Sequence, residues 1–336
     1  MAGARKLVIA RPFGAEPLPE DFCLQEEQEL PPLRDGQILV EALYISLDPF
    51  EWAFKHLHKV GATMIGSQLA RIVESRSAAF PAGRLVVGCF GWRDRTVADV
   101  GPRAHHPLWP PALLPRDLGG LPPSLALGAL GMPGYAAYFG LLDVCDPQPG
   151  DVVVVSGAGG AVGSLAGQIA RIHGCTAVGL VRSDEKVRWL TEELGFEHAF
   201  NYQTSDVGAA LRRVAPGGVD VYYDTVGGDL SSAVADCMRQ RGRIAVCGCV
   251  STYRDPRPPK MLLIPPAVVR KRLRMDGFMF TQWRDRWPEA DERMALWIRQ
   301  GRLKWRETIT DGFLNTPRAF AAMLRGDAIG KALVKV

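Results

Sequence analysis

Three glycines that stand three residues apart are the part of this sequence best suited to chemistry, and that chemistry is phosphate binding. A run of valines over residues 152–155 predicts a buried parallel strand. The glycines follow it directly: Gly157, Gly160 and Gly163. Apolar residues then recur over 162–170 at the spacing of an amphipathic helix. A glycine turn between a strand and a helix aims free N–H groups at an anion and lets a pyrophosphate approach the backbone.

The glycine spacing alone is also compatible with an ordinary tight turn. It departs from the common G-x-G-x-x-G pattern, because Val162 occupies the place of the third glycine. The elements around it favour a nucleotide site. Further strands are expected at 177–181, 219–224 and 243–248, and helices between them at 184–194, 207–214 and 230–238. Strands that alternate with helices predict an α/β Rossmann fold with a doubly wound parallel sheet.

The end of the second expected strand bears on the choice between NAD and NADP. NAD sites usually place an acidic side chain on the ribose, and Asp184 or Glu185 could serve, although both are equally suited to starting the next helix. Arg182, Ser183 and Lys186 offer the donors and the positive charge that a 2′-phosphate requires. The residues themselves leave both coenzymes open, with a slight preference for NADP.

Metal and nucleophile chemistry are not indicated. The pair Cys247 and Cys249 is too closely spaced for a zinc site and is expected on a buried strand, where small thiols are usually core residues. The paired histidines at 105–106 and at 56 and 58 have no cysteine nearby. No G-x-S-x-G motif is present. We therefore expect no metal.

Length and composition set the outer bounds. A chain of 336 residues with 47% hydrophobic residues is suited to two domains with large cores. Its net charge of +4 is too small and dispersed to indicate nucleic acid, and no apolar run reaches the ~18 residues of a membrane span. Seven scattered cysteines are typical of free thiols, which predicts a cytoplasmic location.

The expected elements divide the chain unevenly. Residues up to about 126 are strand-like and rich in turn signals, and the alternating strands and helices extend from there to about 302. The remainder contains a helix at 317–324 and a strand at 332–336. We expect a Rossmann domain at 127–302, inserted into a smaller, strand-rich catalytic domain formed by 1–126 and 303–336.

Several short segments together resemble a known family. They are residues 131–134, 137–140, 160–164, 183–186, 200–202, 226–228, 247–248, 251–253 and 330–331. The chain resembles the zinc-free medium-chain dehydrogenases/reductases, and among them the prostaglandin and 2-alkenal reductases, from about residue 30 to the C-terminus. The resemblance implies that the smaller domain is GroES-like and that the chain forms a homodimer.

The activity implied is an NADPH-dependent reduction of the carbon–carbon double bond in enones and enals, including 15-oxo-prostaglandins and other oxo-eicosanoids, with oxidation of the leukotriene 12-hydroxyl as a further activity. The resemblance assigns the pyrophosphate to Gly160, Ala161, Val162 and Gly163, and the 2′-phosphate side to Ser183, Lys186 and Tyr202. It places Cys247, Val250, Tyr253, Phe278 and Phe280 around the nicotinamide. A quinone reductase and a catalytically weak NADPH-binding regulatory or structural protein are the alternatives.

Tyr253 is the expected catalytic residue. Hydride transfer to the β-carbon builds negative charge on the carbonyl oxygen, and a fixed donor near that oxygen typically stabilises the transition state by ~3 kcal/mol. The resemblance places Tyr253 there as a donating or orienting phenol, whereas the alternative is a half-buried loop tyrosine.

Three segments depart from the family: Phe50-Glu51-Trp52 replaces Tyr-Met-Arg, Ala136 replaces a threonine and Ala328 an asparagine. Each loss removes a hydrogen bond worth ~1 kcal/mol near the coenzyme or substrate.

Overall fold

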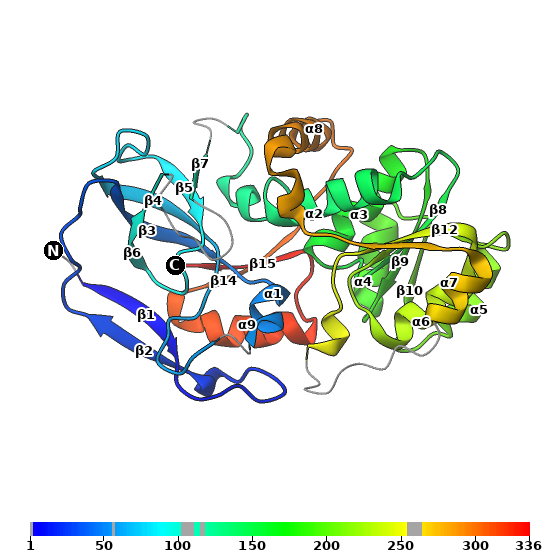
Figure 1. Cartoon of the computed structure of the whole chain (residues 1–336), viewed down its shortest axis with the longest axis horizontal. Helices are drawn as coiled ribbons and strands as arrows, with labels where there is room; N and C mark the ends of the chain where they lie inside the picture. The colour runs from blue at the N-terminus through cyan, green and yellow to red at the C-terminus, as the bar shows by residue number, and fades with distance from the viewer. Residues whose placement is uncertain (1–2, 56–57, 102–110, 115–117, 254–263) are drawn as a thin grey trace. The chain divides into compact units, whose positions relative to one another are not determined.

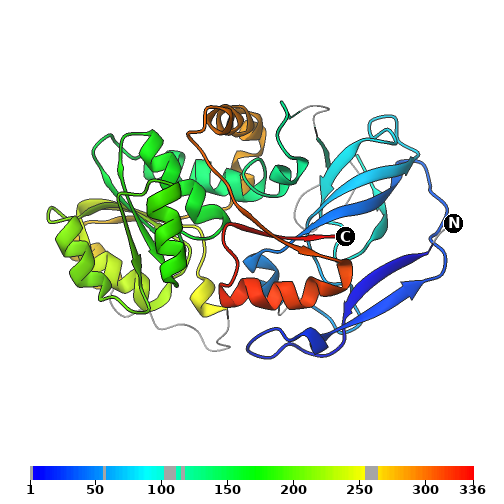
Figure 2. The ribbon, with the colours of Figure 1, turned by 180° about the vertical axis from the view of Figure 1, so that it is seen from behind.

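The computed structural model describes residues 3–55, 58–101, 111–114, 118–253 and 264–336, and the chain forms two compact units. The first comprises Met1–Leu127 and Glu307–Val336, and the second Gly128–Arg306. The insertion begins one residue and ends four residues beyond the expected limits. Figures 1 and 2 show the red end of the chain returning to the blue strands of the first unit, where β15 pairs with β3.

The first unit is built from strands, as its turn-rich sequence predicts. A two-stranded sheet pairs β1 (Ala4–Ile9) with β2 (Phe22–Glu27). The larger sheet has the order β14-β15-β3-β4-β5-β7, with β6 paired to β3. Its strands are β3 (Gln37–Ser46), β4 (Gln68–Ser75), β5 (Leu85–Gly88), β6 (Arg95–Asp99), β7 (Ala112–Leu113), β14 (Glu307–Asp311) and β15 (Lys331–Lys335). Two α-helices belong to the described part of this unit, α1 (Pro49–Ala53) and α9 (Thr316–Arg325).

The second unit contains a six-stranded sheet in which every pairing is parallel. The order is β10-β9-β8-β11-β12-β13, so the first strand of the unit lies in the middle and the chain winds outward from it in both directions. The strands are β8 (Val152–Ser156), β9 (Thr176–Val181), β10 (His198–Asn201), β11 (Val219–Asp224), β12 (Met238–Val246) and β13 (Arg274–Gly277). This topology confirms the doubly wound Rossmann fold.

Helices cover the sheet, and several of them bury apolar side chains against it. The described helices of the unit are α2 (Met132–Phe139), α3 (Ala161–Ile172), α4 (Asp184–Arg188), α5 (Val207–Val214), α6 (Gly228–Cys237), α7 (Ile264–Lys271) and α8 (Trp287–Arg299). Side chains of α5, α6 and α7 form one core with the sheet, in which Leu211, Val234 and Ala267 pack with Val154 and Ile244. Short 3-10 and π segments extend or connect several of these helices.

Four elements differ from the sequence-based expectation. Strand β12 begins at Met238, within the expected helix 230–238, and ends at Val246, so Cys247 and Gly248 lie beyond the strand. Strands β10 and β13 were not predicted, because each has only four residues and is held by its neighbour in the sheet. The apolar residues over 125–142 also predict one helix, which the structure divides: Pro133 lies in the first turn of α2, and a π segment, Gly140–Cys145, follows α2.

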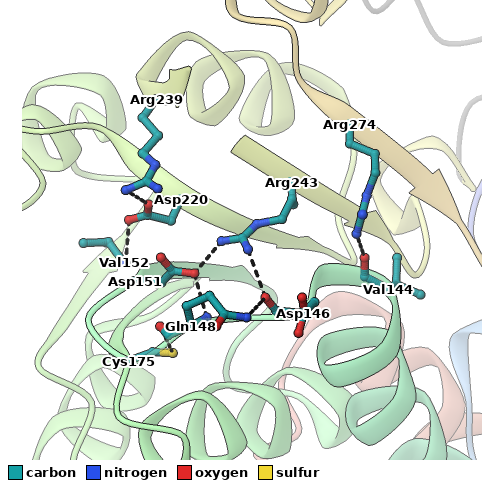
Figure 3. A network of polar contacts seen from close by, with 10 residues as sticks. All are labelled: Val144, Asp146, Gln148, Asp151, Val152, Cys175, Asp220, Arg239, Arg243 and Arg274. Carbon is teal, nitrogen blue, oxygen red and sulfur yellow. Dashed lines mark hydrogen bonds and ion pairs between the residues drawn. The ribbon is translucent and has the colours of Figure 1, made fainter. Parts of the chain in front are cut away.

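The two ends of the parallel strands carry different polar groups. At the amino end, Asp220 accepts a hydrogen bond from the Val152 amide at 2.8 Å and pairs with Arg239. Nearby, Arg243 pairs with Asp151 and donates to the Asp146 carbonyl at 2.9 Å. Figure 3 shows these contacts joining the starts of several strands. Ion pairs and hydrogen bonds within the protein therefore occupy the amino end of the sheet.

Candidate coenzyme site

The expected coenzyme residues of the second unit gather at the carboxyl ends of its strands. Because all six strands are parallel, those ends form one edge of the sheet. Each group follows a different strand: residues 160–163 follow β8, Ser183 and Lys186 follow β9, Tyr202 follows β10, residues 247–253 follow β12, and Phe278 and Phe280 follow β13. Ligands of open α/β sheets bind at this edge.

The glycine turn after β8 leads into α3 as the sequence predicts. Gly157 has a φ of +60°, which favours glycine, and Gly160 caps the helix. A Cβ on Gly163 would lie 2.5 Å from the Gly157 carbonyl oxygen and 2.8 Å from the Ala158 Cα, so only glycine allows this close packing. The first N–H groups of a helix have no partner within it, which makes a helix start after a glycine turn suited to an anion.

Lys186 lies across the same turn. A Cβ on Gly159 would lie 2.7 Å from the Lys186 Cδ and 3.3 Å from its Cβ, and only 8% of the lysine is exposed. The Ser183 hydroxyl accepts the Lys186 amide at 3.4 Å and caps α4. The Lys186 side chain is therefore packed against the glycine turn, at the end of the neighbouring strand.

Tyr202 and Asp184 complete this side of the site. The Tyr202 amide donates to the Val181 carbonyl at 2.9 Å, which fixes the residue beside the end of β9. Burial raises the pKa of its phenol, and the nearby Arg182 charge partly opposes that shift. Asp184 accepts a hydrogen bond from the Asn201 amide group at 2.8 Å, so its carboxylate helps to hold β10. The Asp184 carboxylate thus already has a partner within the protein, while Arg182 and Lys186 bring positive charge to this end of the sheet.

Tyr253 ends a short 3-10 turn, Val250–Thr252, beyond β12. Its hydroxyl lies 3.5 Å from the position that a Cβ on Gly248 would take. Burial, followed by the neighbouring Cys249 thiol, raises the pKa of Tyr253 to about 12. A phenol with that pKa stays protonated at neutral pH and can donate a hydrogen bond to an oxygen that gains charge.

Cys247 and Cys249 were expected within a buried strand, and the structure places them after its end, half-buried. Burial raises the pKa of the Cys247 thiol to about 11, and the thiol is hydrogen-bonded to the Tyr223 hydroxyl. The Tyr223 hydroxyl also donates to the Ala136 carbonyl at 2.7 Å. Cys247 thus belongs to a chain of contacts between β12, β11 and α2.

The two phenylalanines pack against other aromatic rings of the unit. The Phe278 ring lies against Gly140, where a Cβ would collide with it, and meets Trp283 with centroids 5.9 Å apart. Phe280 is buried and stacks on Trp287 at 5.7 Å. Their contact with a nicotinamide stays a prediction.

The segment that departs from the family, Phe50-Glu51-Trp52, belongs to α1 of the first unit, and Glu51 and Trp52 are buried there. Trp52 lies in an aromatic core with Phe13 and Phe320. Neither carboxyl oxygen of Glu51 has a hydrogen-bond partner among the described residues. Burial and then the Asp48 charge raise the pKa of Glu51 well above its ordinary value. An arginine's place in the family is thus filled by core packing in this chain.

Two polar residues of the site were missed by sequence reasoning. Ser156 and Asp224 end the neighbouring strands β8 and β11, are buried, and meet side chain to side chain at 2.9 Å. Each is a polar residue at the end of an apolar strand, a pattern that indicates a residue at the binding edge of the sheet. Because Ser156 and Asp224 are 68 positions apart, the sequence does not show that they meet.

Within the described ranges, no three His, Cys, Asp or Glu side chains come together as a metal site would require. In the same part of the chain, no helix is long and apolar enough to cross a membrane. His56, His105 and His106 lie outside the described residues.

Comparisons with known proteins extend over the whole chain. Two family models match, "Zinc-binding dehydrogenase" at residues 161–295 and "N-terminal domain of oxidoreductase" at 5–104. Prostaglandin reductase 1 of Sus scrofa is 42% identical over 339 residues and covers all of both chains. The NADP(+)-dependent 2-alkenal reductase of Nicotiana tabacum is 34% identical over 91% of this chain and 89% of its own.

Among solved structures, CurA of Vibrio vulnificus in complex with NADPH is similar with a TM-score of 0.89, at 31% identity over 99% of both chains. The full-length match in sequence agrees with the Rossmann topology and with the glycine turn described above. The chain belongs to the prostaglandin reductase 1 family of the medium-chain dehydrogenases/reductases.

Proposed function

We propose that this chain is an NADPH-dependent reductase that saturates the carbon–carbon double bond of α,β-unsaturated ketones and aldehydes. The observation that carries the proposal is the glycine turn before α3, with Lys186 lying across it. This arrangement offers main-chain donors to a pyrophosphate and a cation to a 2′-phosphate. The names of the relatives support the same reaction, since they are prostaglandin and alkenal reductases, and a similar structure holds NADPH.

The chain's own residues divide the work. Gly160, Ala161, Val162 and Gly163 bind the pyrophosphate through their main chain, while Ser183, Lys186 and Tyr202 bind the 2′-phosphate. Cys247, Val250, Phe278 and Phe280 border the nicotinamide.

The bound coenzyme supplies the hydride that is added to the β-carbon. Tyr253 donates a hydrogen bond to the substrate's carbonyl oxygen as charge builds there, and its raised pKa keeps the proton on the phenol. Water delivers the proton to the α-carbon.

The substrates we propose are lipid-like enones and enals. 15-Oxo-prostaglandins and other oxo-eicosanoids are the first candidates, because the relative with 42% identity is named for prostaglandin reduction. Oxidation of the leukotriene 12-hydroxyl is a further candidate activity. We assign the substrate-binding part to the first, strand-rich unit.

The proposal is tested by mixing the protein with NADPH and a medium-length 2-alkenal, then following loss of NADPH absorbance and identifying the saturated aldehyde by mass spectrometry. A parallel reaction with a quinone separates the alternative reductase. Tight NADPH binding by calorimetry without turnover of any enone, enal or quinone would instead indicate a regulatory or structural protein. The departures from the family at Trp52, Ala136 and Ala328 favour that alternative.

We also propose a cytoplasmic homodimer. All seven cysteines are free thiols, which supports a reducing compartment. Strand β13 lies at the edge of its sheet with its four residues exposed, so a second copy has a surface on which to pair. Sedimentation measurements with and without NADPH test the dimer.

A further inference from the structure

The buried carboxylate of Asp224 holds the loop that follows β11. Only 1% of the residue is exposed, and five donors reach its two oxygens. The amides of Val226 and Gly227 each donate to Oδ1 at 3.0 Å. Ser231, on α6, donates to Oδ2. The carboxylate thus closes a tight loop that contains two consecutive glycines with positive φ, at +75° and +66°.

The same carboxylate reaches the strand that precedes the glycine turn. The Ser156 hydroxyl donates to Asp224 at 2.9 Å and accepts the Thr225 amide, also at 2.9 Å. The Thr225 hydroxyl donates to the Ser156 carbonyl at 2.8 Å and would collide with a Cβ on Gly157. The start of the pyrophosphate turn is therefore fastened to the loop after β11.

The loop in turn supports the segment that ends at Tyr253. The Thr225 carbonyl accepts the Val250 amide at 3.2 Å, and the Val226 carbonyl accepts the Ser251 amide at 2.9 Å. The Asp224 carbonyl accepts the Cys247 amide at 2.8 Å. One loop thus touches both the start of the glycine turn, at Ser156 and Gly157, and the segment assigned to the nicotinamide.

We propose that Asp224 is a positioning residue of the coenzyme site, which fixes the loop after β11 and through it the spacing between the glycine turn and the Tyr253 segment. This inference rests on the proposed function, because it supposes that NADPH binds at this edge. A carboxylate suits the role better than an amide because four donors converge on Oδ1 and the Ser231 hydroxyl donates to Oδ2. An asparagine would reverse the contact with Ser231 and would remove the charge that strengthens the other four hydrogen bonds.

The strand provides its own control. Asp220 lies on β11 too, is buried, and accepts a main-chain amide, but at the amino end of the sheet, where Figure 3 shows it with Arg239. Asp224→Asn and Asp220→Asn therefore make the same chemical change at the two ends of one strand, β11. Both should lower the melting temperature, and only the first should alter coenzyme binding.

The experiment measures the Kd of NADPH by fluorescence titration and kcat and KM with a 2-alkenal. We expect Asp224→Asn to raise the Kd at least about tenfold and lower kcat, and Asp220→Asn to change the Kd less than about twofold. Equal Kd values in the two variants, at comparable losses of melting temperature, would overturn the positioning role. If the wild-type protein itself fails to bind NADPH, the proposed function fails before this inference is reached.

Two milder variants cover the case in which Asp224→Asn does not fold. Ser156→Ala removes the hydroxyl that links the glycine turn to Asp224, and we expect it to raise the Kd of NADPH about fivefold. Tyr222→Phe removes a donor to the same carboxylate, at 2.8 Å, whose hydroxyl also meets Ser231 of α6 at 3.2 Å but is not hydrogen-bonded to Ser156. It should lower the melting temperature and leave the Kd unchanged, and a matching rise in Kd for both variants would contradict the proposed route.

Discussion

Two buried carboxyl groups, one in each unit, differ in their hydrogen bonding: one is surrounded by donors and the other, in the part of the chain that the structure describes, has none. Asp224, at the carboxyl edge of the second unit, accepts five hydrogen bonds. Glu51, in α1 of the first unit, is fully buried, and its oxygens have no partner among the described residues. The nearby Lys331 ammonium group pairs with Asp48 instead of Glu51: it donates to the Asp48 carboxylate at 2.6 Å and to the Leu47 carbonyl at 2.8 Å.

The difference shows what a buried acid does in each unit. A carboxylate surrounded by donors has both oxygens hydrogen-bonded and organises the loops that provide those donors. A carboxyl group without donors is most stable when protonated, and it contributes packing in place of charge. We therefore expect coenzyme binding at the carboxyl edge of the second unit to be sensitive to small changes of geometry. Replacing Glu51 in α1 by a neutral residue should raise the free energy of unfolding.

The most severe change at the carboxyl edge is Gly163→Ala. The added methyl would meet the Gly157 carbonyl at 2.5 Å and the Ala158 Cα at 2.8 Å, both of which are backbone atoms that cannot turn aside. We expect a loss of about 3 kcal/mol in the free energy of unfolding and a coenzyme affinity at least about 100-fold weaker. Thermal melts and NADPH titration measure the two effects. Gly217→Ala is the control, because a Cβ there has no heavy atom within 4 Å.

Tyr253→Phe removes a proposed hydrogen-bond donor at the carboxyl edge of the sheet and keeps the aromatic ring. Removing one donor to a developing oxyanion should lower kcat about 100-fold, corresponding to ~3 kcal/mol. The Kd of NADPH should stay within about twofold of the wild-type value, because the hydroxyl is assigned to the substrate and the ring remains. Steady-state kinetics with a 2-alkenal provide the measurement. An unchanged kcat would show that Tyr253 is only a loop residue.

Lys186→Ala addresses coenzyme choice. A charge-assisted contact to a 2′-phosphate contributes about 2 kcal/mol, so NADPH affinity should fall about 30-fold, whereas NADH, which lacks that phosphate, should lose little. Titration with both coenzymes gives the ratio. Similar losses for the two would contradict the phosphate contact. Gly159→Ala should weaken NADPH in the same selective way, since its Cβ would displace the lysine side chain.

Glu51→Gln tests the other member of the comparison and should have the smallest effect. Because burial raises the folded-state pKa of Glu51 above its ordinary 4.5, the folded state holds this proton more tightly than the unfolded state does. The acid therefore favours folding below its unfolded-state pKa, and this contribution is lost as the pH rises from there through the folded-state pKa.

The glutamine variant should accordingly gain about 1 kcal/mol over the wild type at pH 8, and less at pH 5. Denaturant melts at both pH values measure the difference. A variant that is less stable than the wild type at pH 8 would show that the carboxylate is charged and satisfied in the fold.

Much of the second unit could be predicted from the sequence, because its long elements carry local patterns. The valine strand at 152–155 and the helix at 207–214 are present, and α5 has the predicted limits. The short strands β10 and β13 could not be predicted, since four residues depend on a neighbouring strand for their hydrogen bonds. The helix expected at 230–238 was wrong at its end for a related reason: Met238 and the residues after it pair in the sheet.

By itself the sequence determined the fold class, the glycine turn and the choice of side chains at the strand ends, because each depends on the spacing of a few neighbouring residues. Only the tertiary structure decided which groups meet there. Ser156 comes to Asp224, Lys186 comes to lie over Gly159, and Glu51 is buried without a donor. Whether a buried acid becomes an organising anion or a neutral core residue depends on the donors that distant segments bring to it, and no local pattern contains that information.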